Sequence, residues 1–173
     1  SLYLILARLE SANQNNAKAR EFIAASLKEK ENYAAAIFFQ SQLEAAEGKI
    51  KEAIATVEKV SLIAPNDSGV FFQLGLLKYN NREWRGAVAA LERAIALNPS
   101  YANARYFLGL SYHRISDWDK AVAEFEELLK TNPDNAEVKL VLGNLKARRS
   151  PFADARPPLD DAPEKRPSLP LDE

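Results

Sequence analysis

The chain has 173 residues, 47% of them hydrophobic and 27% charged, a balance typical of a globular protein with a buried core. Its 23 basic and 24 acidic residues leave a formal charge of −1, without the basic surplus that phosphate binding requires, so we expect no nucleic-acid partner. Cysteine is absent, which excludes disulfides, thiolate zinc sites and thiol nucleophiles but fits a reducing and an oxidising compartment equally well, so localisation stays open.

The sequence shows no membrane span and no signal peptide. The longest uncharged run of interest, residues 33–43, is shorter than the ~18 apolar residues that a spanning helix needs. We therefore expect no direct membrane insertion by this stretch of chain. The sequence starts at Ser1 and contains no methionine, so we expect it to be a piece of a longer protein.

Four residue types recur along the chain at a step of 34 residues. Proline, glycine, alanine and tryptophan share this step, which indicates an internal repeat. The recurring positions are Pro65, Pro99 and Pro133; Gly75, Gly109 and Gly143; Ala19, Ala53, Ala87 and Ala121; and Trp84 and Trp118.

The unit 68–101 shows what each repeat contains. Its leucines and isoleucine recur at helical spacing, and Asn80-Asn81 interrupts them midway, which predicts two antiparallel helices joined by a short turn. Gly75 and Ala87 are small, as a close crossing of the two helices requires. Pro99 ends the second helix because it lacks an amide proton and disfavours helical backbone in the residue before it.

This unit resembles the tetratricopeptide repeat family, whose helix–turn–helix unit has 34 residues. The family pattern places an aromatic residue, Leu, Gly and Tyr on the first helix, then Ala, Phe, Ala and Pro. Lys78 departs from it where Tyr is usual. The residues that match are Phe71, Leu74, Gly75, Ala87, Leu91, Ala94 and Pro99.

In chain order, the other units match this pattern to different degrees. Residues 1–33 match least and end without proline, and in residues 34–67 Gln40 and Ser41 replace Leu and Gly. Residues 102–135 match well except at Arg105 and Leu128, and residues 136–149 carry Leu142 and Gly143 but stop after one helix. The resemblance therefore implies an all-α, antiparallel helix-hairpin solenoid of four repeats, closed by a capping helix at 136–149.

The composition changes at Ser150. Residues 150–173 contain six of the nine prolines, which excludes a long helix and predicts an extended or disordered tail. A proline-rich segment also suits an aromatic groove, because its extended form is already populated. We therefore also consider that the tail binds its own repeats, with Leu159, Leu169 and Leu171 as anchors.

No catalytic, metal or cofactor constellation is recognisable. His113 is the only histidine, and neither a glycine-rich phosphate loop nor a metal-loop spacing of carboxylates is present. We expect that the chain is not an enzyme and that it has no cofactor.

The resemblance implies that the first helix of each hairpin lines a concave face that holds a protein or peptide. The family's groove positions give an apolar, aromatic-rich strip with a few amides, although these side chains, Leu76 and Leu110 above all, can instead pack between helices. The cations of a carboxylate clamp are missing. The candidate peptide-binding residues are Phe38, Gln42, Phe72, Leu76, Tyr79, Asn80, Asn103, Tyr106, Leu110 and His113.

Two functions remain open at this stage. The first is a protein–protein interaction scaffold that binds a peptide or partner segment along the concave groove. The alternative is the soluble tetratricopeptide region of a larger protein, such as a membrane-anchored bacterial protein, whose activity lies outside this chain.

Overall fold

The computed structural model describes residues 1–153, and these contain nine α-helices and no strand, so the all-α prediction is confirmed for them. None of the nine is long and apolar enough to cross a membrane. The predictions for the tail beyond residue 153 lie outside the described residues. The helices are α1 (Leu2–Ala12), α2 (Asn16–Glu29), α3 (Ala34–Ala46), α4 (Ile50–Ile63), α5 (Ser68–Asn80), α6 (Trp84–Leu97), α7 (Ala102–Arg114), α8 (Trp118–Thr131) and α9 (Ala136–Lys146).

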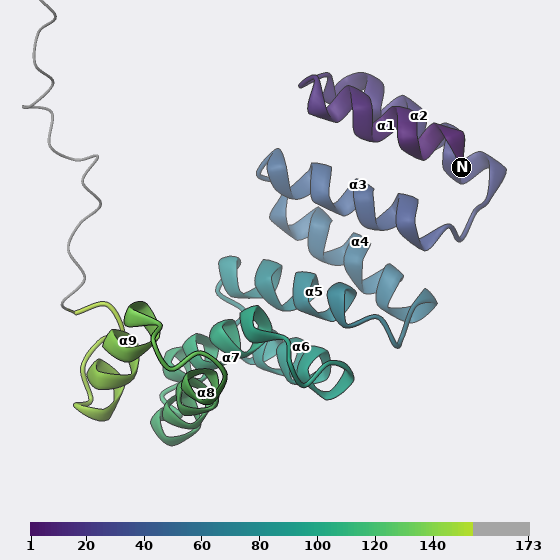
Figure 1. Ribbon diagram of the computed structural model, residues 1–173. Coiled ribbons are helices and arrows are strands. Elements are labelled where there is room, and N and C mark those ends of the chain that lie inside the picture. The colour runs from purple at the N-terminus through teal and green to yellow at the C-terminus, as the bar shows by residue number, and fades with distance from the viewer. Residues whose placement is uncertain (154–173) are drawn as a thin grey trace, which may run out of the picture.

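The helices form a stack of hairpins in chain order (Figure 1). Within each hairpin the first helix packs on the second, and each second helix packs on the first helix of the next hairpin. The helices α1 and α2 lie at one end of the stack and the single helix α9 at the other (Figure 1). Helix α9 ends at Lys146, so the capping helix is shorter than the predicted 136–149.

The turn inside each hairpin repeats with the same 34-residue step. Its central residue has a positive φ of 62° to 77° at Gln14, Gly48, Arg82 and Ser116. Around Arg82, the Arg82 amide donates to the Tyr79 carbonyl at 3.0 Å and the Glu83 amide to the Lys78 carbonyl at 2.9 Å. This pair of bonds is a Schellman motif, which satisfies the last carbonyls of a helix.

The junctions between successive hairpins confirm that proline follows the end of each second helix from α4 to α8. Pro65, Pro99 and Pro133 each stand two residues after the last residue of α4, α6 and α8. After the first of them, the Asp67 side chain accepts hydrogen bonds from the amides of Gly69 and Val70 at the start of α5. Proline thus ends one helix, and a capping side chain begins the next.

The glycines inside two hairpins lie against large side chains of the facing helix. A Cβ atom at Gly75 would be 2.5 Å from Cγ of Leu91, and one at Gly109 would be 2.6 Å from Cε2 of Phe125. The predicted close approach is therefore present, although Gly75 faces mainly Leu91 and meets Ala87 only at its carbonyl oxygen. A Cβ at Gly143 would meet no atom of the described chain within 4 Å.

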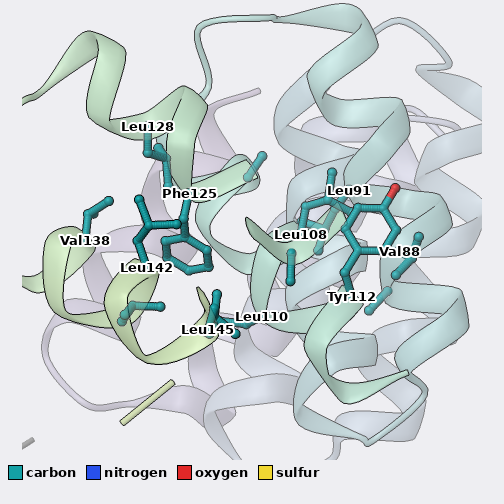
Figure 2. Close-up of a cluster of buried hydrophobic side chains, with 14 of the residues drawn as sticks. Val88, Leu91, Leu108, Leu110, Tyr112, Phe125, Leu128, Val138, Leu142 and Leu145 are labelled. Carbon is teal, nitrogen blue, oxygen red and sulfur yellow. The ribbon is translucent and has the colours of Figure 1, made fainter. Parts of the chain in front are cut away.

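Three clusters of buried side chains follow one another along the stack. The largest joins α6, α7, α8 and α9, and Phe125 of α8 is fully buried in it together with Leu145 of α9. Figure 2 shows part of this cluster, with Val138, Leu142 and Leu145 of α9 facing the hairpin before them. The core is thus continuous between hairpins, as the stacking of repeats requires.

One face of α1 is bare where the same face of every later first helix is covered. Leu2, Ile5 and Leu9 are 69%, 65% and 56% exposed. The residues at the same register in α3, α5, α7 and α9 are buried or half-buried, and each of those helices lies on the second helix of the preceding hairpin. These covered residues are Ala36, Phe39 and Leu43; Val70, Gln73 and Leu77; Ala104, Phe107 and Ser111; and Val138, Val141 and Leu145.

Candidate functional site

The candidate residues form rows across the first helices α3, α5 and α7. Phe38, Phe72 and Tyr106 stand 34 residues apart, and so do Gln42, Leu76 and Leu110. Because stacked hairpins repeat the same register, each row runs from helix to helix along one face of the stack. We call this face, defined by the ten candidate residues, the groove face.

The exposure of the groove face is uneven. The amides of Gln42, Asn80 and Asn103 are exposed. Leu110 is only 5% exposed and belongs to the core. The remaining six are half-buried: Phe38, Phe72, Leu76, Tyr79, Tyr106 and His113.

Three aromatic residues of the groove face, Phe72, Tyr79 and Tyr106, are linked through Phe107, which is not among the ten candidates. Phe107 lies with its ring centre 6.2 Å from that of Phe72, 5.6 Å from that of Tyr79 and 5.7 Å from that of Tyr106. Phe72 also lies 4.8 Å from Tyr101. These rings therefore form one half-buried aromatic cluster across α5 and α7.

Tyr106 has a further contact that orients it. Its hydroxyl donates a hydrogen bond to Oε1 of Glu137 on α9 at 2.6 Å. Burial, together with this bond and the charge of Glu137, raises the pKa of the Tyr106 hydroxyl. The phenol therefore stays neutral and remains a donor across the physiological range.

A first hollow borders the groove face at Phe38 of α3 and extends over the ends of the neighbouring hairpins. Its volume is about 550 Å³, and Phe38 contributes an aromatic wall. Arg8 and Lys30 bring positive charge to its lining and Asp67 brings negative charge. The remaining lining residues are Asn32, Tyr33, Ala34, Ala35, Val60, Ile63, Ala64, Gly69 and Val70.

A second hollow lies further along the same face, between α7 and α9. It measures about 310 Å³ and is lined by Asn103 and Tyr106 together with Phe107, Glu137 and Val138. The exposed amide of Asn103 stands at its edge beside the neutral phenol of Tyr106. The amide can donate to and accept from a peptide backbone, whereas the phenol oxygen, whose proton is given to Glu137, can accept from one.

The third part of the groove face is occupied by the chain itself. Ser150, Pro151 and Phe152 lie against Tyr79, Leu110, His113 and Arg114, leaving a space of only about 30 Å³. Pro151 is buried, and its carbonyl accepts a hydrogen bond of 3.0 Å from Nδ2 of Asn144, a residue only 1% exposed. The start of the tail thus turns back onto the groove face.

His113 is held in place at this end of the groove face. Its ring lies edge-on to Trp118, with the ring centres 4.7 Å apart. Burial, reinforced by the positive charge of Arg114, lowers the pKa of His113, so the imidazole is neutral near pH 7. Among residues 1–153, no group of three or more His, Cys, Asp or Glu side chains is arranged to hold a metal ion.

The comparisons with known proteins agree with this architecture. A family model described as Tetratricopeptide repeat matches residues 72–124 and 114–170, which together span more than half of the chain. The chain belongs to the tetratricopeptide repeat family. No curated protein was found to match this tetratricopeptide repeat chain.

Three solved structures illustrate the shared fold of this tetratricopeptide repeat chain. MamA (residues 41 to the end) from Desulfovibrio magneticus RS-1 matches with a TM-score of 0.78 and 20% identity, covering 85% of this chain and 83% of that one. YrrB, described as a TPR protein with an unusual peptide-binding site, gives 0.76 and 23%, with coverages of 84% and 75%. The first TPR of Spaghetti (RPAP3), bound to the HSP90 peptide SRMEEVD, gives 0.63 and 21%, with coverages of 66% and 91%.

Proposed function

We propose that this chain is a protein–protein interaction scaffold that binds a polypeptide segment along the groove face. The observation that carries the proposal is a pair of open hollows, of about 550 Å³ bordering that face at Phe38 and about 310 Å³ at Asn103 and Tyr106. Both are walled by aromatic side chains, Phe38 in one and Tyr106 with Phe107 in the other. Aromatic walls bury a large apolar area with few rotatable bonds, so they bind side chains at a low entropic cost.

The exposed amides of the groove face supply polar recognition. Gln42, Asn80 and Asn103 can each donate to and accept from a peptide backbone. The printed descriptions of YrrB and of the RPAP3 domain name peptides as their ligands, which supports the same use of this fold. The clamp cations are missing from the corresponding positions of this chain, so we propose an internal segment as the ligand, and not a terminal carboxylate.

Peptide selection and matched variants test this proposal. Peptides selected from a displayed random library on the chain should bind it, and Gln42→Ala and Asn103→Ala should each weaken their affinity about fivefold, the loss of ~1 kcal/mol expected for one neutral hydrogen bond. Lys51→Ala, at an exposed position on the second helix α4, is the control and should leave affinity unchanged. If both amide variants bind as the unaltered chain does, the segment does not lie on the groove face.

The bare face of α1 favours the second candidate function, in which these repeats are one region of a larger protein. Leu2, Ile5 and Leu9 occupy the register that a preceding second helix covers on every later first helix. A further hairpin stacked on α1 would bury these three side chains in the same way.

A fusion tests whether α1 accepts such a hairpin. A copy of residues 68–102 joined ahead of Ser1, which keeps the 34-residue register, should slow amide hydrogen exchange in α1. The same fusion carrying Leu2→Lys, Ile5→Lys and Leu9→Lys should not. Equal exchange in the two fusions would show that the exposed face does not take part in stacking.

A further inference from the structure

The chain turns back onto its own groove face at the point where a further second helix would begin. The amide of Arg149 donates to the Asn144 carbonyl at 2.8 Å, and Arg148 has a φ of 55°, so α9 ends in the same Schellman motif as the other first helices. In the four hairpins, the second helix starts two residues after the positive-φ residue. At the equivalent place, Ser150 instead opens a turn, in which the Ala153 amide donates to the Ser150 carbonyl at 3.0 Å.

This turn is only partly buried, and its hydrogen bonding to the groove face is incomplete. Pro151 is buried and its carbonyl accepts from Nδ2 of Asn144, but Phe152 is still 45% exposed. Among the described residues, the buried Oδ1 of Asn144 accepts no hydrogen bond. A buried acceptor without a donor destabilises the state that contains it.

The turn at Pro151 offers Asn144 a carbonyl but no amide proton from the same residue. An extended residue presents its N–H and its C=O on the same side, which matches the donor and the acceptor of one side-chain amide. Pro151 offers a carbonyl but has no amide proton, so it can satisfy only Nδ2 of Asn144. An extended segment with a non-proline residue at this place can offer a partner to both atoms of the amide.

We propose that Ser150, Pro151 and Phe152 form a replaceable plug, which closes the α7–α9 end of the groove face until an extended partner segment displaces it. The partner segment bonds Asn144 through both the N–H and the C=O of one non-proline residue and packs beside Tyr79, Leu110 and His113. This inference rests on the proposed function, because the plug competes for the same face. The plug is an intramolecular competitor, so a partner segment binds only if its affinity is high enough to displace the plug.

The test opens the plug without altering the wall of the groove. Pro151→Lys places a charge in a buried site beside Arg114 and His113, so the segment should leave its seat. In nuclear magnetic resonance spectra of the full chain, the side-chain NH₂ signal of Asn144 should be protected from solvent exchange and should lose this protection in Pro151→Lys. Leu62→Lys is the matched control, because Leu62 is 83% exposed on α4 and lines none of the three hollows of the groove face.

Peptides selected from a displayed random library on the Pro151→Lys chain then measure the competition. They should bind this chain at least tenfold more tightly than the unaltered chain or Leu62→Lys, and saturating peptide should shift the Asn144 signal of the unaltered chain. Equal affinity for all three chains, with the Asn144 signal unmoved, overturns the plug while leaving the proposed function in place. A library that yields no binder to the Pro151→Lys chain overturns both the proposed function and the displacement of the plug by a partner. An Asn144 signal that does not change in Pro151→Lys shows that residues 150–152 are not bound to Asn144 in solution, and so overturns the plug.

Discussion

Small residues at fixed positions decide how closely the two helices of a hairpin approach. Gly75 and Gly109 leave room for Leu91 and Phe125, which are both fully buried. Gly143 occupies the same register in α9 but faces no second helix among the described residues, so its small size serves no contact there. The same residue type is therefore essential at two positions of the repeat and dispensable at a third.

Gly109→Leu should destabilise the chain by at least ~1–3 kcal/mol through overpacking against Phe125. Gly143→Ala is the matched control, since glycine inside a helix costs ~0.5–1 kcal/mol relative to alanine and no neighbour obstructs the new methyl group. Urea unfolding of both variants measures the two changes. A Gly109→Leu free energy of unfolding equal to that of the unaltered chain would show that the small residue is incidental.

The turns provide a second comparison at the residue scale. Gly48 and Ser116 hold the same left-handed backbone, with φ of 77° and 65°, but only glycine adopts it without strain. Gly48→Ala should therefore lower the free energy of unfolding by ~1 kcal/mol, and Ser116→Gly should raise it by up to ~1 kcal/mol. Thermal melts of the two variants should shift in opposite directions, and shifts in the same direction would refute this explanation.

Some residues of the groove face could be predicted from the sequence and others could not. The family's groove positions, carried along the 34-residue step, gave the rows that contain Phe38, Phe72 and Tyr106. The sequence shows Phe107 only as an aromatic residue directly after Tyr106. Its ring contacts could not be predicted, because they involve helices from two hairpins. The seat of Pro151 on Asn144 has no periodic signal at all, since it joins a turn to a helix by a single hydrogen bond.

At the scale of the elements, the first hairpin is covered by a neighbouring hairpin on one side only. The apolar face of α1 is exposed, and a hollow of about 440 Å³ lies among α2, α3 and α4, away from the groove face. The low match of residues 1–33 to the repeat pattern was visible in the sequence, whereas the hollow depends on side-chain packing. Hairpins gain stability from their neighbours, so the first hairpin should be the weakest unit.

Hydrogen exchange should show this order directly. The amides of α1 and α2 should exchange faster than those of α5 to α8, because each middle hairpin is covered on both sides. Slower exchange in α1 and α2 than in residues 68–135 would contradict the expected order of opening.

Two leucines at the same register test the role of the covering helix. Leu9 is 56% exposed on α1, and Leu43 is 4% exposed on α3. Leu43→Ala should lower the free energy of unfolding by ~2–5 kcal/mol, as for other buried leucines, whereas Leu9→Ala should change it by less than ~0.5 kcal/mol. Similar losses in urea unfolding of both variants would mean that the α1 face is buried in solution.

At the scale of the whole molecule, the stack produces one long face from short repeated rows. Each hairpin contributes a few groove residues, and the linked rings around Phe107 connect those of α5 with those of α7. One end of this face is open at Phe38, and the other is partly filled by Ser150, Pro151 and Phe152. A partner segment that lies along the face would therefore contact several hairpins at once.

The most direct test of this account is a map of the amide signals that change when a selected peptide is added to the full chain. The account predicts that the changes follow α3, α5 and α7 along the groove face, near Phe38, Gln42, Asn103 and Tyr106. The second helices α4 and α6 should change little at their exposed residues, such as Lys51 and Glu92. Changes confined to those second helices, or to the hollow among α2, α3 and α4, would contradict it.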